Sequence, residues 1–251
     1  MRRKSDGTII TLLTDFGLSD SYVAEVKGVL LSRAPGVVLV DITHQVQPGD
    51  LRAAQYVLGR TWARLPAGTV HLAIVDPGVG TARRALAATA GGHHFVAPDN
   101  GLLSFLAGPR VVSLPVPKDA APTFHGRDVF APAAAALARG ATLESLGAPI
   151  TDASHTPLPA PAHDGTVVLG EVIYVDRFGT LISNIPGDQV EPGVRIRVGG
   201  VDVGGLRRTF ADAERGALLA LVGSGGTVEV AVRDGSAARL LGVGVGADVR
   251  A

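Results

Sequence analysis

The chain has 251 residues, of which 46% are hydrophobic and only 18% charged, a composition that predicts a compact globular protein and not a disordered one. Lysine plus arginine and aspartate plus glutamate both number 23, and this zero net charge argues against nucleic acid or an anionic membrane as a partner. There is no cysteine, which excludes disulfide frameworks, thiolate zinc sites and cysteine nucleophiles.

No apolar run approaches the roughly 18 residues that a membrane-spanning helix needs. The basic start, residues 1–7, leads into a short strand-like run, whereas a secretory signal has a longer apolar core. We therefore expect a soluble, cytoplasmic protein.

Residues 8–150 alternate between apolar runs and helical patterns. In chain order, they predict a strand over 8–13, a helix ending near residue 32, a strand over 37–42, a helix over 51–61, a strand over 69–75 and a helix over 129–138. Strands that alternate with helices through short loops are typical of a parallel sheet covered on both faces. The sequence thus predicts an α/β N-terminal domain, residues 1–155, with a mostly parallel central sheet.

The character of the chain changes at residues 156–165, a proline-rich stretch that we interpret as a linker. Beyond it, short apolar runs are separated by glycines, which is typical of small antiparallel sheets and barrels. The second domain, 166–251, is therefore predicted to be all-β, antiparallel and barrel-like, with strands over 166–175, 181–184, 194–198, 217–222 and 227–232.

The loop after the strand over 69–75 is the most informative segment for function. It begins with Asp76-Pro77-Gly78, and strand ends of this kind are where α/β proteins place their chemistry. Arg83 follows seven residues later, and His125 lies in a second polar segment, Phe124 to Asp128. An acid, an arginine and a histidine brought together in this way could activate a water molecule.

Five motifs in order carry a family resemblance. They are Thr14-Asp15-Phe16-Gly17, Asp76-Pro77-Gly78-Val79-Gly80-Thr81, Ala97-Pro98-Asp99-Asn100-Gly101-Leu102-Leu103, Phe124-His125-Gly126-Arg127-Asp128 and Asp176-Arg177-Phe178-Gly179. Together they resemble the S-adenosyl-L-methionine hydroxide adenosyltransferases, the water-using relatives of the fluorinases and chlorinases. The resemblance extends from about residue 9 to residue 249.

This resemblance implies cleavage of S-adenosyl-L-methionine by water to adenosine and L-methionine, with no cofactor and no metal. It also implies a homotrimer whose active site is shared between subunits. The catalytic residues would be Asp76, Arg83 and His125. The substrate-binding residues would be Asp15 on the ribose hydroxyls, Phe124, and, from the second domain, Asp176, Phe178, Phe210 and Ser224 on the adenine and methionine ends.

Two positions depart from the family pattern. Thr180 stands where the family usually has asparagine, and Gly225 stands where a polar side chain is common. The contacts to adenine and to the methionine carboxylate are therefore the part of the resemblance that remains open. The water-using branch is favoured because Asp76, Arg83 and His125 are all present. The long insertion of the fluorinases is also missing, since only residues 84–96 bridge the second and third motifs.

The residues also allow simpler explanations. Asp76 could be a turn residue, Arg83 a solvated surface cation, and His125 a histidine packed under the following helix. Two other functions stay open at this stage. One is a binding protein for S-adenosyl-L-methionine or adenosine without turnover. The other is a metal-dependent phosphoesterase, whose candidate ligands are Asp15, Asp41, His44, Asp76, His93, His94 and His125.

Overall fold

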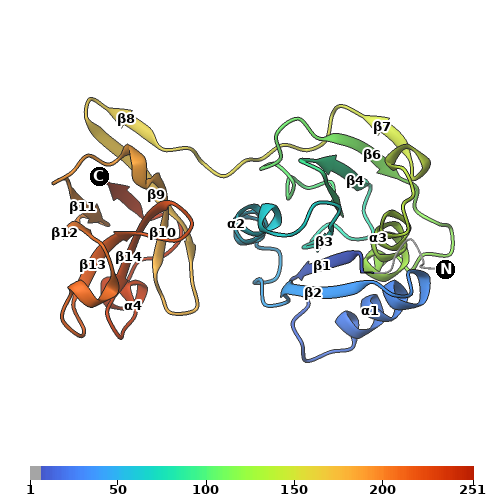
Figure 1. Ribbon diagram of the computed structural model, residues 1–251, viewed down its shortest axis with the longest axis horizontal. Coiled ribbons are helices and arrows are strands. Elements are labelled where there is room, and N and C mark those ends of the chain that lie inside the picture. Colours follow the sequence, from blue (N-terminus) through green and yellow to red (C-terminus); the bar gives the residue numbers. More distant parts are fainter. Residues whose placement is uncertain (1–6) are drawn as a thin grey trace. The chain divides into compact units, whose positions relative to one another are not determined.

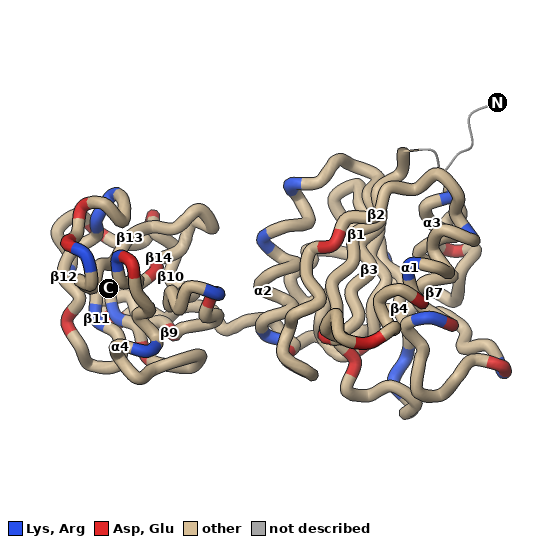
Figure 2. The backbone as a smooth tube through the Cα atoms, turned by 90° about the horizontal axis from the view of Figure 1, so that it is seen from below, with Lys and Arg blue, Asp and Glu red and all other residues tan. Residues whose placement is uncertain are grey.

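The computed structural model describes residues 7–251, so the basic start of the chain lies outside the described residues. The chain forms two compact units, the first reaching to Pro157 and the second spanning Leu158–Ala251 (Figure 1). Charged residues of both signs are interspersed along both units (Figure 2). Within residues 7–251, no helix has both the length and the apolar character required to cross a membrane.

The first unit is built on one seven-stranded sheet with the strand order β2-β1-β3-β5-β4-β6-β7. The strands that form it are β1 Ile9–Thr14, β2 Val38–Thr43, β3 Val70–Ile74, β4 Ala85–Ala90, β5 His93–Pro98, β6 Arg110–Leu114 and β7 Ala148–Ile150. Strands β2, β1, β3 and β5 run parallel to one another, whereas β5–β4, β4–β6 and β6–β7 are antiparallel pairs.

This mixed sheet corrects the expectation of a mostly parallel one. After β3 the chain continues into a hairpin instead of a helical crossover, because Gly91-Gly92 forms a two-residue turn between β4 and β5. Both glycines have positive φ, as the favoured two-residue hairpin turns require. Half of the sheet is therefore antiparallel.

Helices cover both faces of the sheet. On one face, α1 (Tyr22–Arg33) and α3 (Ala131–Ala138) pack over a core that includes Ile10, Leu12 and Leu72. On the other face, α2 (Leu51–Thr61) packs over alternate positions of the same strands, among them Leu13 and Ala73. The helix predicted over 51–61 is confirmed as α2.

The second unit is all-β. Its strands are β8 Ala162–Asp164, β9 Val167–Val175, β10 Leu181–Pro186, β11 Arg195–Val198, β12 Val201–Arg207, β13 Leu218–Val222, β14 Thr227–Val232 and β15 Asp248–Arg250. Strand β10 pairs with both β9 and β14, which closes seven strands into a barrel, and β8 is added to β9 outside the ring. The barrel-like prediction is confirmed, although β8 falls within the expected linker 156–165 and β12–β13 is a parallel pair.

Candidate active site

The sheet topology brings the two ends of the 76–84 loop to one edge of the sheet, namely the edge at which the parallel strands have their carboxyl ends. Thr14 lies opposite Ile74 in the parallel β1–β3 pair, so Asp15 and Asp76 leave the sheet at the same edge. Strand β4 starts at this edge too, because Ala85 pairs with Pro98, the last residue of β5. Arg83, two residues before Ala85, therefore returns to the edge that Asp76 left.

Arg83 lies between the other two candidate catalytic residues. Its Nε donates a hydrogen bond of 2.8 Å to Oδ1 of Asp76, and its Nη2 donates to Oδ2 of the same carboxylate. The same Nη2 lies 3.0 Å from Nδ1 of His125. The side chains of Arg83 and Asp76 are only 9% and 5% exposed, so this bidentate ion pair is shielded from solvent.

His125 reaches the pair from the other side. It directly precedes a turn of π-helix, Gly126–Phe130, that leads into α3, and it is buried. Burial lowers the pKa of His125 below its usual range, and the positive charge of Arg83 lowers it further. His125 is therefore neutral near pH 7. Since its Nδ1 accepts from Arg83, its Nε2 must carry the proton and act as a donor.

Arg83 has one further donor available. Its guanidinium lies over the ring of Phe130, 5.2 Å from the ring centroid. Its Nη1 is buried and makes no hydrogen bond within the described part of the chain. A buried donor without an acceptor is costly unless a ligand or water oxygen supplies one. The arrangement is suited to hold an oxygen atom with partial negative charge.

Asp15 lies on the neighbouring loop, half-buried, and its Oδ2 accepts a 2.9 Å hydrogen bond from the backbone of Gly49. Burial raises the pKa of Asp15, and the nearby charge of Asp76 raises it further, whereas the bond from Gly49 opposes both effects. The two carboxylates thus influence one another across the same edge of the sheet.

Phe124 belongs to an aromatic cluster beside this edge. Its ring lies 6.0 Å from that of Phe16 and 5.3 Å from that of Tyr22, both in edge-to-face contacts. The three rings line a cavity of about 370 Å³, with Glu25 and Arg127 also in its wall. Aromatic walls with a few polar groups are typical of sites for small organic ligands.

The other predicted binding residues lie in the second unit. Oδ1 of Asp176 accepts 2.9 Å hydrogen bonds from the backbone amides of Phe178 and Thr180, so this carboxylate shapes its own turn. Phe178 and Phe210 are 76% and 48% exposed, which is unusual for phenylalanine on the surface of a monomeric protein. These two rings are open to a ligand or to another protein surface.

Ser224 does not lie with Asp176 within the barrel. Leu181 pairs with Val230, and Pro186 pairs with Thr227, so the loop before β10 and the loop before β14 lie at opposite ends of these strands. Six residues of strand span on the order of 15–20 Å. A ligand in contact with both Asp176 and Ser224 would have to bridge that length.

Several of the residues considered as metal ligands make other contacts. Among residues 7–251, no group of three or more His, Asp or Glu side chains is arranged to hold a metal ion. His44 bonds to Thr14 over 2.8 Å and lies 3.1 Å from Asp41. His93 lies in β5, where it accepts or donates a 3.1 Å bond with His71 inside the sheet.

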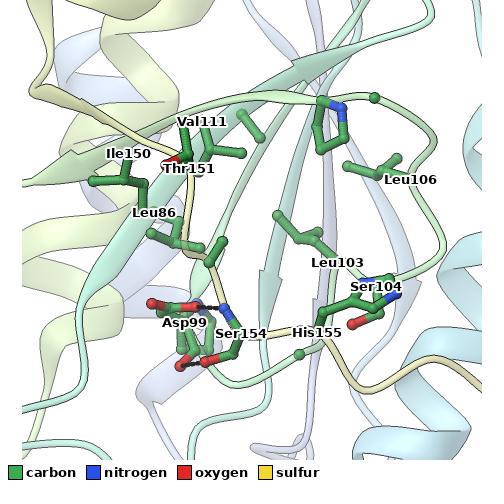
Figure 3. Close-up of a pocket in the computed structure, with 16 residues that line it drawn as sticks. Leu86, Asp99, Leu103, Ser104, Leu106, Val111, Ile150, Thr151, Ser154 and His155 are labelled. Carbon is green, nitrogen blue, oxygen red and sulfur yellow. Dashed lines mark hydrogen bonds between the residues drawn. The ribbon is translucent and has the colours of Figure 1, made fainter.

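A second cavity of about 400 Å³ lies over β4 and β6 of the first unit (Figure 3). Its wall includes apolar side chains such as Leu86, Leu103 and Val111, and Asp99 and Ser154 lie together at one end. The sequence singled out Asp99 and Asn100 only as part of a motif and gave them no role.

The comparisons with known proteins identify a family. Residues 10–147 match the family model of the SAM hydroxide adenosyltransferase N-terminal domain, and residues 170–250 match that of the C-terminal domain. A protein of Thermus thermophilus named (R)-S-adenosyl-L-methionine hydrolase is 47% identical, over 96% of this chain and 98% of its own length. A fluorinase of Nocardia brasiliensis is 32% identical, over 89% of each chain.

A solved structure supports the fold. The crystal structure of an uncharacterised conserved protein from Thermotoga maritima superposes with a TM-score of 0.89 and 36% identity, covering 96% of this chain and 98% of that one. Both family models match, and together they cover most of the chain. The chain therefore belongs to the SAM hydroxide adenosyltransferase family.

Proposed function

We propose that this protein hydrolyses S-adenosyl-L-methionine to adenosine and L-methionine. The observation that carries the proposal is Arg83, buried between Asp76 and His125 at the edge of the sheet, with a donor that no described residue satisfies. The names of the relatives support the same reaction, since one of them is an S-adenosyl-L-methionine hydrolase of nearly the same length.

The reaction is a displacement at the ribose 5′ carbon. The oxygen of water forms a bond to that carbon, the carbon–sulfur bond breaks, and its electron pair returns to sulfur as the thioether of methionine. A sulfonium leaves readily, so the enzyme has to supply a strong nucleophile and aim it. Fixing the water in line with the breaking bond contributes part of the rate.

We assign two tasks within the triad, on the basis of its hydrogen bonds. Arg83 and the Nε2–H of His125 are donors, and they would stabilise hydroxide character on the water. Neither can take its proton, because Arg83 stays protonated and Nδ1 of His125 is occupied by Arg83. Asp76 keeps free lone pairs in addition to those that bind Arg83, so we assign it as the group that accepts the proton.

The rest of the substrate would be held by both units. We assign Asp15 to the ribose hydroxyls and Phe124 to the apolar wall of the site. Asp176, Phe178, Phe210 and Ser224 would bind the adenine and methionine ends. No cofactor is needed, because the nucleophile is water and the leaving group is part of the substrate.

We also propose that the protein is a homotrimer in which each active site is shared between two subunits. The exposed rings of Phe178 and Phe210 support this arrangement, because contact with a neighbouring subunit or its substrate would cover them. A closed ring of three subunits requires a head-to-tail interface, in which one unit of each chain faces the other unit of the next.

The test is incubation of the purified protein with S-adenosyl-L-methionine, followed by chromatography. Adenosine and methionine should appear in equal amounts, with no metal added. Calorimetry on the same sample measures binding separately from turnover. Binding without any adenosine after long incubation would replace the enzyme with a binding protein, and the absence of both would contradict the proposal altogether.

A further inference from the structure

The loop from Asp76 to Arg84 crosses over a strand that is not its neighbour in sequence. It joins β3 to β4, but the strand order is β3-β5-β4, so β5 lies between the two ends of the loop. Residues that follow β5 therefore lie beneath this loop, at the edge where Asp76 and Arg83 meet. The first two of them are Asp99 and Asn100.

Asn100 holds the first end of the loop. Its Nδ2 donates a 2.8 Å hydrogen bond to the backbone carbonyl of Val75, the fully buried residue directly before Asp76. Its Oδ1 accepts a 3.3 Å bond from the backbone amide of Leu102, which fixes the orientation of the amide group. Asn100 thus links the end of β3 to the end of β5.

Asp99 holds the second end. Its side chain is 4% exposed, and its Oδ2 accepts a 2.7 Å hydrogen bond from Nε of Arg84, the residue directly after Arg83. The backbone amide of Asp99 also donates to the carbonyl of Arg84 over 3.0 Å. Its Oδ1 accepts a 2.7 Å bond from the amide of Ser154, and Figure 3 shows this contact at the end of the second cavity.

Arg84 extends the anchor to a third segment. Its Nη1 donates to Oδ1 of Asp152 over 2.7 Å, and its Nη2 donates to the backbone carbonyl of Asp152 over 2.8 Å. The side chain of Arg84 therefore bridges Asp99 and Asp152. Arg83 and Arg84 are adjacent in sequence, but Arg83 binds Asp76 whereas Arg84 binds Asp99 and Asp152.

We infer that Asp99 and Asn100 are positioning residues for the hydrolysis proposed above, an inference that rests on that proposed function. Neither bonds to Arg83, Asp76 or His125. They act by fixing the backbone at both ends of the loop, and this fixes the distance and orientation between the backbone of Asp76 and that of Arg83. We call these two residues the β5 clamp.

A fixed backbone matters here because the loop itself is adaptable. Gly78 and Gly80 lie within it, and Gly80 has a φ of +77° and approaches the carbonyl of Pro122. Glycine gives a loop many alternative conformations. Without the β5 clamp, Arg83 would still pair with Asp76, but the pair could shift relative to His125. Displacements of about 1 Å in such sites cost on the order of a hundredfold in rate.

The first experiment compares Asn100→Ala with Asn184→Ala. Asn184 is a matched control, because its Nδ2 donates to a backbone carbonyl (Pro159) and its Oδ1 accepts from a backbone amide (Glu171), but in the second unit. We expect Asn100→Ala to lower kcat about 10- to 100-fold with little change in KM. Asn184→Ala should leave kcat within about threefold of the parent, at a similar loss of stability.

A double-mutant cycle separates positioning from general destabilisation. If the clamp acts through Arg83, Asn100→Ala should have almost no further effect on kcat in an Arg83→Ala chain, whereas two unrelated defects multiply. A readout without turnover is the NMR signal of the Arg83 Nε–H. It should be sharp in the parent and in Asn184→Ala, and broadened or shifted in Asn100→Ala.

Arg84→Lys keeps the test available if Asn100→Ala does not fold. Arg84 is one-third exposed, so lysine fits there, but one ammonium cannot bridge Asp99 and Asp152 as a guanidinium does. A folded Arg84→Lys protein should lose kcat and keep KM. If the parent hydrolyses S-adenosyl-L-methionine while Asn100→Ala and Arg84→Lys both keep full kcat and an unchanged Arg83 signal, the inference is wrong and the proposed function stands. A parent without hydrolysis contradicts the proposed function instead, and the Arg83 signal still tests the clamp.

Discussion

Nη2 of Arg83 lies 3.0 Å from Nδ1 of His125, and this contact determines which nitrogen of the imidazole carries the proton. A guanidinium can only donate, so Nδ1 must be an acceptor and Nε2 a donor. We therefore propose that His125 donates to the oxygen of the water and does not deprotonate it. The sequence left the division of work between Asp76 and His125 open, and this one distance supports giving the proton to Asp76.

Substitutions in the triad should lower the rate more than the affinity. We expect Arg83→Ala, His125→Ala and Asp76→Asn each to reduce kcat at least about 100-fold, since a charge-stabilising or proton-accepting group is lost. KM should change far less. The three effects should not multiply, because the groups act as a unit. Steady-state kinetics of the single and triple variants measures this, and a triple variant with near-normal turnover would rule out the mechanism.

The rate should depend on pH through His125. The pKa of His125 is lowered by burial and by Arg83, so it lies below the usual value of about 6.5. Protonation would force two donors, Nδ1–H and Arg83, against each other. We expect kcat to be constant from pH 8 to about pH 6.5 and to fall at lower pH. An acid limb that is still present in His125→Ala would assign the titration to another group.

Removal of metal ions should not change turnover. The motivation is that, in the described part of the chain, no three His, Asp or Glu side chains are arranged to hold a metal ion. Activity measured before and after dialysis against excess EDTA should agree within about twofold. Loss of activity in EDTA that returns when one divalent cation is added back would revive the metal-dependent alternative.

A shared active site can be tested by complementation. Asp76→Asn should inactivate the site in the first unit, and Asp176→Asn removes a charge from the second unit while keeping the oxygen that accepts from Phe178 and Thr180. Each variant should be inactive alone. Mixed under conditions that exchange subunits, they should regain part of the parental activity. Mixed trimers that are proven by mass spectrometry but remain inactive would place the whole site in one chain.

The stability of the fold should decrease on acidification because of a histidine remote from the site. His71 is fully buried, bonds to Thr11 and His93, and has its pKa lowered to about 3 by burial and by neighbouring histidines. A group whose folded pKa is depressed stabilises the fold above its unfolded pKa. The free energy of unfolding should therefore decline from about pH 6.5 towards pH 3, by up to about 1.4 kcal/mol per pH unit for this group.

Two variants check this origin. His71→Gln should be less stable than the parent at pH 7 but should show a shallower decline on acidification. His163→Gln, at an exposed position in β8, should follow the parent curve. Urea unfolding at several pH values gives the comparison, and an equal slope in the parent and in His71→Gln would contradict the assignment.

Local sequence signals predicted the elements whose hydrophobic pattern is regular. Helix α2 and strands β1, β2 and β3 lie within one or two residues of their predicted bounds. The antiparallel half of the sheet was not predicted, although Gly91-Gly92 offered a hairpin signal. Strand β12 was missed because its Gly204-Gly205 pair has low strand propensity. These strands form because of their hydrogen bonds to neighbouring strands, and a single sequence does not show which strands will pair.

The candidate site shows the same division. Asp76 and His125 could be predicted because each lies in a short motif, and Arg83 because it follows the first of these motifs closely; the structure brings Arg83 into contact with both. The β5 clamp could not be predicted. Its contacts with Val75 and Arg84 depend on the insertion of β5 between β3 and β4, and residues 15 to 25 positions apart in sequence meet only as a result of that order.

The insertion of β5 also has a consequence for the order in which the molecule forms. While the chain is being synthesised, β3, the 76–84 loop and β4 emerge before β5, but β3 and β4 are not partners and cannot pair correctly with each other. The two ends of the loop acquire their final separation only when β5 enters between them, and β5 pairs in parallel with β3 on one side and antiparallel with β4 on the other. The β4–β5 pair is a local hairpin, but the pairing of β5 with β3 is non-local, and non-local pairing is slow compared with helix or hairpin formation. Arg83 and Asp76 therefore reach their final relative positions late. A nascent chain that ends before residue 93 contains both residues but no active site.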